Sequence, residues 1–86
     1  MKYVFVEESW DDYLYWQQTD KKLLQRINKL LKDIARDPFS GIGKPEPLRS
    51  KYSGYWSRRI DDKHRLIYKV RQNEILIAKC RFHYDD

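Results

Sequence analysis

Cysteine, proline, glycine and long apolar runs are all scarce in this sequence, and each scarcity excludes a class of protein. The single cysteine, Cys80, cannot form an internal disulfide and has no second cysteine with which to share a metal, which fits a reducing compartment. No apolar run approaches the roughly 18 residues of a membrane span. The N-terminal segment turns acidic at Glu7 and Glu8, too early for a signal peptide. We therefore expect a cytoplasmic protein with no membrane partner.

The chain is short, and its charge is unevenly distributed. A length of 86 residues fits one small domain, so residues 1–86 are predicted to form a single domain. The net charge is +5, but residues 1–20 carry one lysine against five acidic residues, whereas residues 44–84 carry eleven lysines or arginines against four acidic residues. Such a basic half indicates an anionic partner, with nucleic acid as the first candidate. Charge alone fits ordinary solubilising charge equally well.

Glycine and proline cluster in one place and divide the chain into a helical half and a strand-rich half. Residues 38–47 hold all three prolines and two of the three glycines, which predicts a loop. Before this loop, residues 2–6 are strand-prone, and Ser9 is expected to cap a first helix. Thr19 or Asp20 is expected to cap a second helix, which ends at the loop because the residue before a proline avoids helical torsions. The apolar residues that recur with helical spacing in the second helix are Leu23, Ile27, Leu30, Leu31 and Ile34.

After the loop, apolar and basic residues alternate with a period of two in residues 52–60, 65–71 and 74–84. This alternation is typical of an antiparallel sheet with one buried and one wet face. The apolar even positions, expected to face the helices, are Trp56, Ile60, Leu66, Tyr68, Val70, Leu76, Ala78, Cys80 and Phe82. The odd positions expected on the open face include Tyr55, Ser57, Arg59, Arg65, Arg81 and His83, with Ile75 and Ile77 as exceptions to the polar pattern. Because residues 61–64 form an even-numbered connection, we expect an irregularity at that turn.

These signals predict an α+β fold in which two N-terminal helices pack on one face of a twisted, mainly antiparallel sheet. The opposite face is then basic, with aromatic residues interspersed. Single-stranded RNA suits such a surface, since cations hold the backbone and aromatic rings stack on splayed bases. The residues predicted to bind this substrate are Lys44, Arg49, Lys51, Tyr55 and Arg81.

Cleavage of RNA without a metal requires three functions on such a face. The 2′-hydroxyl must lose a proton, the phosphorane charge must be stabilised, and the leaving 5′-oxygen must gain a proton. Glu46, then Arg65 or Arg59, then His83 are the candidates in that order. Taken singly, each is more simply interpreted as a surface side chain, because isolated ionisable residues are seldom catalytic. The four glutamates and nine aspartates show no ligand spacing around the two histidines, so we expect no metal and no other cofactor.

Five segments resemble the YoeB toxins of the RelE superfamily in content, order and spacing. They are residues 7–17 (EESWDDYLYWQ), 43–48 (GKPEPL), 53–60 (SGYWSRRI), 64–68 (HRLIY) and 80–84 (CRFHY). The resemblance implies a RelE-like microbial RNase fold and a ribosome-dependent endonuclease that cleaves messenger RNA in the decoding site, leaving a 2′,3′-cyclic phosphate. It implies that Glu46 is the general base and His83 the general acid. It also implies that Arg65 stabilises the phosphate, that Arg59 is a second active-site arginine, and that Tyr84 is a terminal aromatic that helps to organise the site and substrate.

The resemblance also implies partners. These are messenger RNA on the 70S ribosome and a cognate YefM-like antitoxin whose tail wraps the site, with operator DNA bound only through the antitoxin; a homodimer is considered as well. Asp85 and Asp86 follow the His-Tyr pair of the family pattern, and they either oppose phosphate or extend into solvent. Two other functions stay open on the residues alone, namely a non-catalytic nucleic-acid-binding module and a module that docks an acidic protein. Glu46 favours the nuclease over the binding module, because a carboxylate opposes the binding of an anion.

Overall fold

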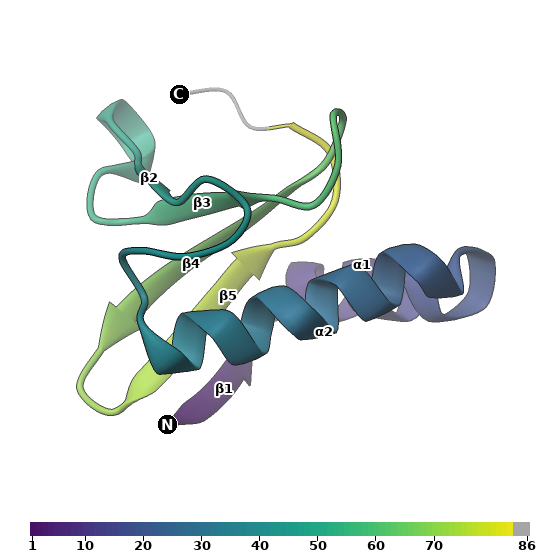
Figure 1. Cartoon of the computed structure of the whole chain (residues 1–86), viewed down its shortest axis with the longest axis horizontal. Coiled ribbons are helices and arrows are strands. Elements are labelled where there is room, and N and C mark those ends of the chain that lie inside the picture. Colours follow the sequence, from purple (N-terminus) through teal and green to yellow (C-terminus); the bar gives the residue numbers. More distant parts are fainter. Residues whose placement is uncertain (84–86) are drawn as a thin grey trace.

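The chain forms a five-stranded sheet with two helices packed on one of its faces (Figure 1). The computed structural model describes residues 1–83. In chain order the elements are β1 (Lys2–Phe5), α1 (Glu7–Thr19), α2 (Lys21–Arg36), β2 (Glu46–Pro47), the 3-10 turn η1 (Ser50–Tyr52), β3 (Trp56–Arg59), β4 (Arg65–Arg71) and β5 (Glu74–Lys79). The strands lie in the order β1-β5-β4-β3-β2, and only β1 and β5 pair in parallel. The predicted α+β class, with two helices on a mainly antiparallel sheet, is confirmed.

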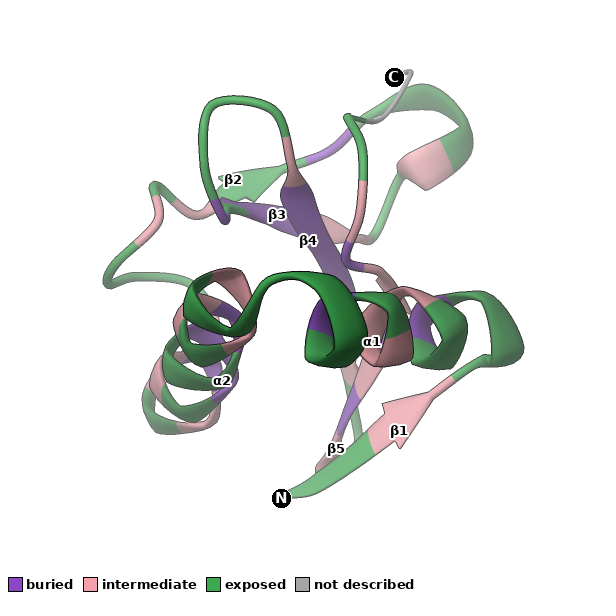
Figure 2. Cartoon of the chain, turned by 90° about the vertical axis from the view of Figure 1, so that its right-hand side faces the viewer, coloured by how far each residue is buried: buried purple, intermediate pink, exposed green. Residues whose placement is uncertain are grey.

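The core lies between the helices and the central strands, where burial in Figure 2 is greatest. The helical side contributes Trp16 from α1 and the predicted apolar residues of α2, of which Ile27, Leu30 and Ile34 are fully buried. Figure 2 shows that the outward surfaces of both helices are exposed, as expected for amphipathic helices that cover a sheet. No helix among residues 1–83 is long and apolar enough to span a membrane.

The second helix begins as predicted, but the first does not. Asp20 caps α2, since its Oδ1 accepts a hydrogen bond from the Leu23 amide at 3.1 Å. Ser9 is not the N-cap residue that the sequence predicted, because the helix begins at Glu7; Ser9 is its third residue and completes a capping box with Val6. The Ser9 hydroxyl is fully buried, accepts from the Val6 amide at 3.0 Å and donates to the Ile77 carbonyl at 2.6 Å. Ser9 therefore ties α1 to β5.

The alternation of faces is confirmed in β3 and β4 and is wrong in most of β5. Leu66 and Tyr68 belong to the core as expected, but in β5 the core residues are Ile75 and Ile77 rather than Leu76 and Ala78. The reason is a register shift. Ile67 pairs with Lys79 and Tyr68 pairs with Ile77, so Ala78 is an extra residue that reverses the phase of the strand. Cys80 lies beyond the shift and returns to the core, as predicted.

The expected irregularity at the preceding turn is not a register shift. Arg59 pairs directly with Arg65, so Ile60 belongs to the connection, which spans residues 60–64 and is odd in number. Odd positions of β3 and β4 therefore share a face without a bulge. The strand β4 has the predicted bounds. Two strands are shorter than predicted, because β3 begins at Trp56 and β5 ends at Lys79. The predicted loop contains the short strand β2.

Arg58 is the one charged residue of β3 that points to the helical side. Its side chain is 0% exposed, and Nη1 lies 2.6 Å from the Asp33 carboxylate of α2. The same guanidinium donates to the carbonyl oxygens of Ile42, Asp37 and Ser40, at 2.9, 2.8 and 3.1 Å. Its charge is thus paired and its donors are satisfied, which a buried arginine requires.

Replacing Arg58 should strongly destabilise the fold. Arg58→Met leaves the Asp33 carboxylate and three loop carbonyls without this donor, so we expect the free energy of unfolding to fall by about 3–5 kcal/mol. Arg36 offers a matched control, because it binds the same carboxylate at 3.1 Å with a side chain that is 61% exposed. Arg36→Met should change stability by at most about 0.5 kcal/mol. Urea denaturation measures both changes. Equal losses of unfolding free energy in the two variants would contradict the stabilising role of Arg58.

Acid should weaken this anchor at a defined pH. Hydrogen bonding to Arg58, and then to the Ile42 amide, lowers the pKa of Asp33 from 3.8 to about 2. Because the folded-state pKa is below the unfolded value, the stabilisation is fully present above about pH 4 and is lost as the pH falls towards 2. The difference in unfolding free energy between the wild type and Asp33→Asn should therefore shrink over this range. A difference that stays constant from pH 5 to pH 2 would contradict a stabilising role of the ionised Asp33 carboxylate.

Candidate functional site

A polar hollow on the side of the sheet away from α2 gathers four of the five predicted catalytic residues. It has a volume of about 270 Å³ and is lined by Lys44, Glu46, Ser57, Arg59, Arg65 and His83. Neighbouring residues on a strand point to opposite faces. Since Arg58 points to α2, Ser57 and Arg59 point away from it. The structure thus brings Glu46, Arg59, Arg65 and His83 together on the face expected from the sequence.

The strand register sets the spacing within the hollow. Glu46 pairs with Ser57, and Arg59 pairs with Arg65, so each pair projects from adjacent strands towards the same side. Two like charges directly opposite each other destabilise a sheet unless something compensates them. An anion between the two guanidinium groups would supply that compensation. The arginine pair therefore makes the hollow a candidate site for a phosphate group.

Arg65 is held more firmly than Arg59. Only 7% of the surface of Arg65 is exposed to solvent. Its Nη1 donates to the Asp61 and His64 carbonyl oxygens at 2.7 and 3.1 Å. A guanidinium has five N–H donors, so these bonds engage only part of it. Arg59 is exposed. The hollow therefore contains one arginine with a fixed orientation and one on the surface.

The loop before β2 places Glu46 beside the arginines. The Arg59 amide donates to the Gly43 carbonyl at 2.7 Å, which fixes the loop to the end of β3. Gly43 has a φ of 80°, and a Cβ atom there would lie 2.8 Å from Leu30 Cδ2, so only glycine fits. Pro45 and Pro47 flank Glu46 and restrict its backbone torsions. The exposed carboxylate of Glu46 thus rests on a well-fixed backbone.

The residues predicted to bind substrate do not all lie in this hollow. Lys44 lines it, and Arg49 lines an adjoining hollow together with Glu46. Lys51 and Tyr55 lie beside a further ring, that of Tyr52, with Lys51 Nζ 5.6 Å from its centroid and the Tyr55 centroid 6.2 Å away. They form a cation and aromatic cluster apart from the residues that line the polar hollow.

The prediction that Arg81 faces the open side with the other arginines is wrong. Its guanidinium carbon lies 3.5 Å from the centroid of the Tyr15 ring on α1 and 4.5 Å from that of Phe82. The reason is that β5 ends at Lys79, so the alternation no longer governs the residues that follow. Tyr84, the predicted terminal aromatic, lies outside the described residues.

Two residues near the hollow were not predicted to belong to the site. Ser57 lines the hollow and follows from the same alternation as Arg59, so the sequence pattern held its signal. His64 lies in the turn before β4, and its Nδ1 accepts a hydrogen bond from the Phe82 amide at 2.7 Å. No pattern in the sequence joins two residues so far apart along the chain.

Among residues 1–83, the structure shows neither a reactive thiol nor a metal-binding cluster. Burial raises the pKa of the Cys80 thiol to about 12, so it is no nucleophile near neutral pH. Within residues 1–83, no group of three or more His, Cys, Asp or Glu side chains is arranged to hold a metal ion.

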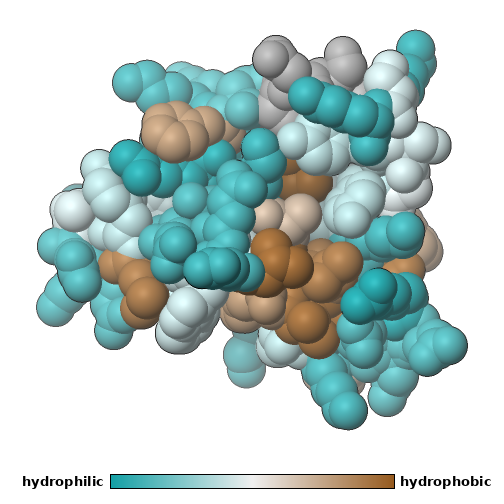
Figure 3. All heavy atoms as spheres, turned by 180° about the vertical axis from the view of Figure 1, so that it is seen from behind, coloured by the Kyte–Doolittle hydropathy of each residue, from teal (hydrophilic) through white to brown (hydrophobic). Residues whose placement is uncertain are grey.

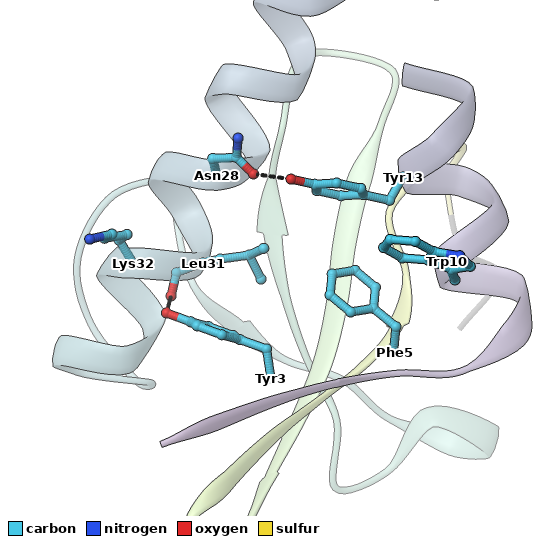
Figure 4. A pocket seen from close by; sticks show the side chains of 7 residues that line it. All are labelled: Tyr3, Phe5, Trp10, Tyr13, Asn28, Leu31 and Lys32. Atoms are coloured by element: carbon cyan, nitrogen blue, oxygen red, sulfur yellow. Dashed lines mark hydrogen bonds between the residues drawn. The ribbon is translucent and has the colours of Figure 1, made fainter. Parts of the chain in front are cut away.

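A second hollow lies on the helical side and is apolar (Figure 4). Phe5, Trp10 and Leu31 are among the residues that line it. Both of its tyrosine hydroxyls have partners, since the Tyr13 hydroxyl donates to Asn28 Oδ1 at 2.6 Å and the Tyr3 hydroxyl donates to the Leu31 carbonyl at 3.1 Å. It contains no acid–base pair. Viewed from behind, the molecule is mostly hydrophilic, with its main hydrophobic area near the centre and smaller ones elsewhere (Figure 3).

Comparison with known proteins places this chain among bacterial toxins. Residues 5–84 match the family described as "YoeB-like toxin of bacterial type II toxin-antitoxin system". Over 84 residues the chain is 64% identical to Toxin YoeB of Synechocystis sp., with 98% of each protein covered.

Solved structures agree. The fold superimposes on the YoeB/ParE toxin from Agrobacterium tumefaciens with a TM-score of 0.96, at 48% identity and with 98% of this chain and 100% of that chain covered. It superimposes on YoeB from Staphylococcus aureus at 49% identity, with TM-scores of 0.92 for a structure described as a YoeB dimer and 0.91 for a heterotetrameric YoeB-YefM complex. In both, 98% of each chain is covered.

The charges around the hollow should have opposite effects on RNA binding. Arg59→Gln removes a cation, so affinity for a short 2′-O-methylated RNA should fall, and the slope of log Kd against log salt should decrease by about one. Glu46→Gln removes an opposing carboxylate and should raise affinity. Arg36→Gln removes the same charge as Arg59→Gln, from an exposed position on α2. Equal slope changes for Arg36→Gln and Arg59→Gln, measured by titration at several salt concentrations, would show that the hollow does not bind phosphate.

Proposed function

Because this chain belongs to the YoeB-like toxins of bacterial type II toxin–antitoxin systems, we propose that it is an endoribonuclease that cleaves messenger RNA in the A site of the ribosome and thereby inhibits translation. The observation that carries the proposal is the convergence of a carboxylate, two arginines and a histidine in one hollow. These groups match the three functions that metal-independent cleavage of RNA requires.

In the proposed reaction, the carboxylate, the two arginines and the histidine each have one role. The Glu46 carboxylate accepts the proton of the 2′-hydroxyl, and the 2′-oxygen forms a bond to the adjacent phosphorus. Arg65 and Arg59 stabilise the negative charge that accumulates on the phosphorane oxygens. The bond from phosphorus to the 5′-oxygen breaks as His83 donates a proton to that oxygen. The products are a 2′,3′-cyclic phosphate and a free 5′-hydroxyl.

Positioning supplies much of the rate in this proposal. A carboxylate is a weak base towards an alcohol, so Glu46 needs the 2′-hydroxyl held in line for attack. The flanking prolines and the Gly43 contact fix the carboxylate on the protein side. The ribosome fixes the message on the other side, which accounts for dependence on it. We assign to Tyr84 the role of the terminal aromatic that organises site and substrate.

A non-catalytic RNA-binding module is the alternative function. The exposed lysine and arginine of the hollow, Lys44 and Arg59, suit binding alone. The placement of Glu46 in the same hollow favours catalysis, because a carboxylate among cations weakens the attraction for phosphate.

The partners follow from the same family. We propose a YefM-like antitoxin that covers the site and alone contacts operator DNA, because the Staphylococcus aureus relative is described as a heterotetrameric YoeB-YefM complex. We also propose a homodimer, since another structure of that relative is described as a YoeB dimer.

Substitutions should separate catalysis from binding. Glu46→Gln and His83→Ala each remove a proton-transfer group, so single-turnover cleavage of a ribosome-bound message should fall by about 10²–10⁴-fold with no loss of binding. Arg65→Ala removes a cation and should impair both, with the larger loss in cleavage because charge accumulates in the transition state.

Lys32→Ala on the exposed side of α2 is the control and should leave cleavage and binding unchanged. Near-normal cleavage by both Glu46→Gln and His83→Ala would exclude the proton-transfer assignment. Loss of binding equal to the loss of cleavage would show that the hollow only docks RNA.

A further inference from the structure

The segment after β5 leaves the sheet and carries His83 to the hollow. Its first residue is anchored on α1, since Trp16 Nε1 donates to the Cys80 carbonyl at 2.8 Å and the Cys80 amide donates to Asp12 Oδ2 at 3.0 Å. Beyond this anchor no strand pairing holds the chain, because β5 ends at Lys79. The residue before His83, Phe82, is therefore one determinant of where His83 lies.

Both backbone polar groups of Phe82 are held by two consecutive residues. Its amide donates to His64 Nδ1 at 2.7 Å, and its carbonyl accepts from the Arg65 amide at 3.1 Å. Phe82 adopts a φ of 66°, a left-handed conformation that costs energy in a residue with a side chain. Such a conformation persists only where the surroundings impose it. The two hydrogen bonds are the restraints that impose it here.

His64 is itself immobilised from several directions. Its amide donates to Asp61 Oδ1 at 2.7 Å, and its carbonyl accepts from the Ile60 amide at 3.0 Å. Its half-buried ring packs edge-on against Trp16, with the centroids 4.7 Å apart and the planes at 74°. The acceptor that meets Phe82 is thus a fixed point of the fold.

We propose that His64 is a positioning residue, which holds His83 in the hollow by accepting the Phe82 amide at Nδ1. The inference rests on the proposed ribonuclease function, in which His83 is the general acid. A ring nitrogen that accepts a hydrogen bond carries no hydrogen, so the neutral ring is protonated at Nε2. The restraint by His64 also bears on Arg65, whose amide binds the carbonyl of the same residue, Phe82.

Three substitutions of His64 separate its acceptor from its bulk. The side-chain oxygen of asparagine reaches approximately the position of Nδ1, that of glutamine reaches approximately the position of Nε2, and leucine offers no acceptor. Displacement of a catalytic group by about 1 Å costs up to about 100-fold in rate. We expect His64→Leu and His64→Gln to lower single-turnover cleavage about 10- to 100-fold at nearly unchanged affinity for the ribosome, and His64→Asn to recover most of the rate.

The rescue isolates the hydrogen bond, because asparagine and leucine both remove the ring that packs on Trp16. If His64→Asn is as slow as His64→Leu, or if His64→Leu is as fast as the wild type, the proposal is wrong. His64→Leu should also lose most of its effect when His83 is already alanine. An equal effect in both backgrounds would show that His64 acts elsewhere and would overturn the proposal.

Hydrogen exchange at the Phe82 amide reports on the restraint without any ribonuclease assay. We expect slow exchange in the wild type and in His64→Asn, and fast exchange in His64→Leu. Equal exchange in all three would overturn the proposal. A wild-type protein that does not cleave ribosome-bound RNA, but shows this exchange pattern, would refute the ribonuclease function and leave His64 as the residue that places His83.

Discussion

The buried guanidinium of Arg58 is the interaction on which the arrangement of the molecule depends. It joins α2, through Asp33, to the loop that follows this helix, through the carbonyls of Asp37, Ser40 and Ile42. It also accounts for the path of that loop, which continues through Gly43 to Glu46. The residue beside it on β3, Arg59, faces the hollow from the opposite side of the sheet. The strand β3 thus carries Arg58, which stabilises the fold, next to Arg59, which lines the hollow.

The site is assembled from three segments that are fixed in different ways. Arg59 and Arg65 are paired by the sheet register, Glu46 is held by a loop that docks on β3, and His83 follows a segment held by side chains of α1 and of the turn before β4. The hollow therefore lies on the open face, while several of the contacts that position its residues lie on the helical face. Substitutions in the core at Trp16 or Leu30 would therefore displace residues of the hollow that they do not contact.

Much of this could be predicted from the sequence, and the failures have identifiable causes. Periodicity located both helices, three strands and the face on which Arg59 and Arg65 lie, because side-chain direction in regular elements follows residue number. It failed at Ser9, Leu76 and Arg81. Ser9 was expected to be the N-cap because serine favours that position, but it lies inside the first turn and bonds to β5. A register shift leaves no mark on the composition of β5. Alternation no longer predicts side-chain direction once a strand has ended. The burial of Arg58 was missed for a related reason, since a charged residue gives no sign that its partner is Asp33 on α2.

The parallel pairing of β1 with β5 makes assembly depend on the order of synthesis. The first strand and both helices leave the ribosome early, but the strand that β1 pairs with and the residues that line the hollow come later in the chain. Long-range pairings of this kind form slowly, because the ends of a long loop must first be brought together. The nascent chain therefore cannot possess the complete hollow until synthesis has passed residue 83. Every shorter nascent chain lacks His83, and with it the group proposed to protonate the 5′-oxygen.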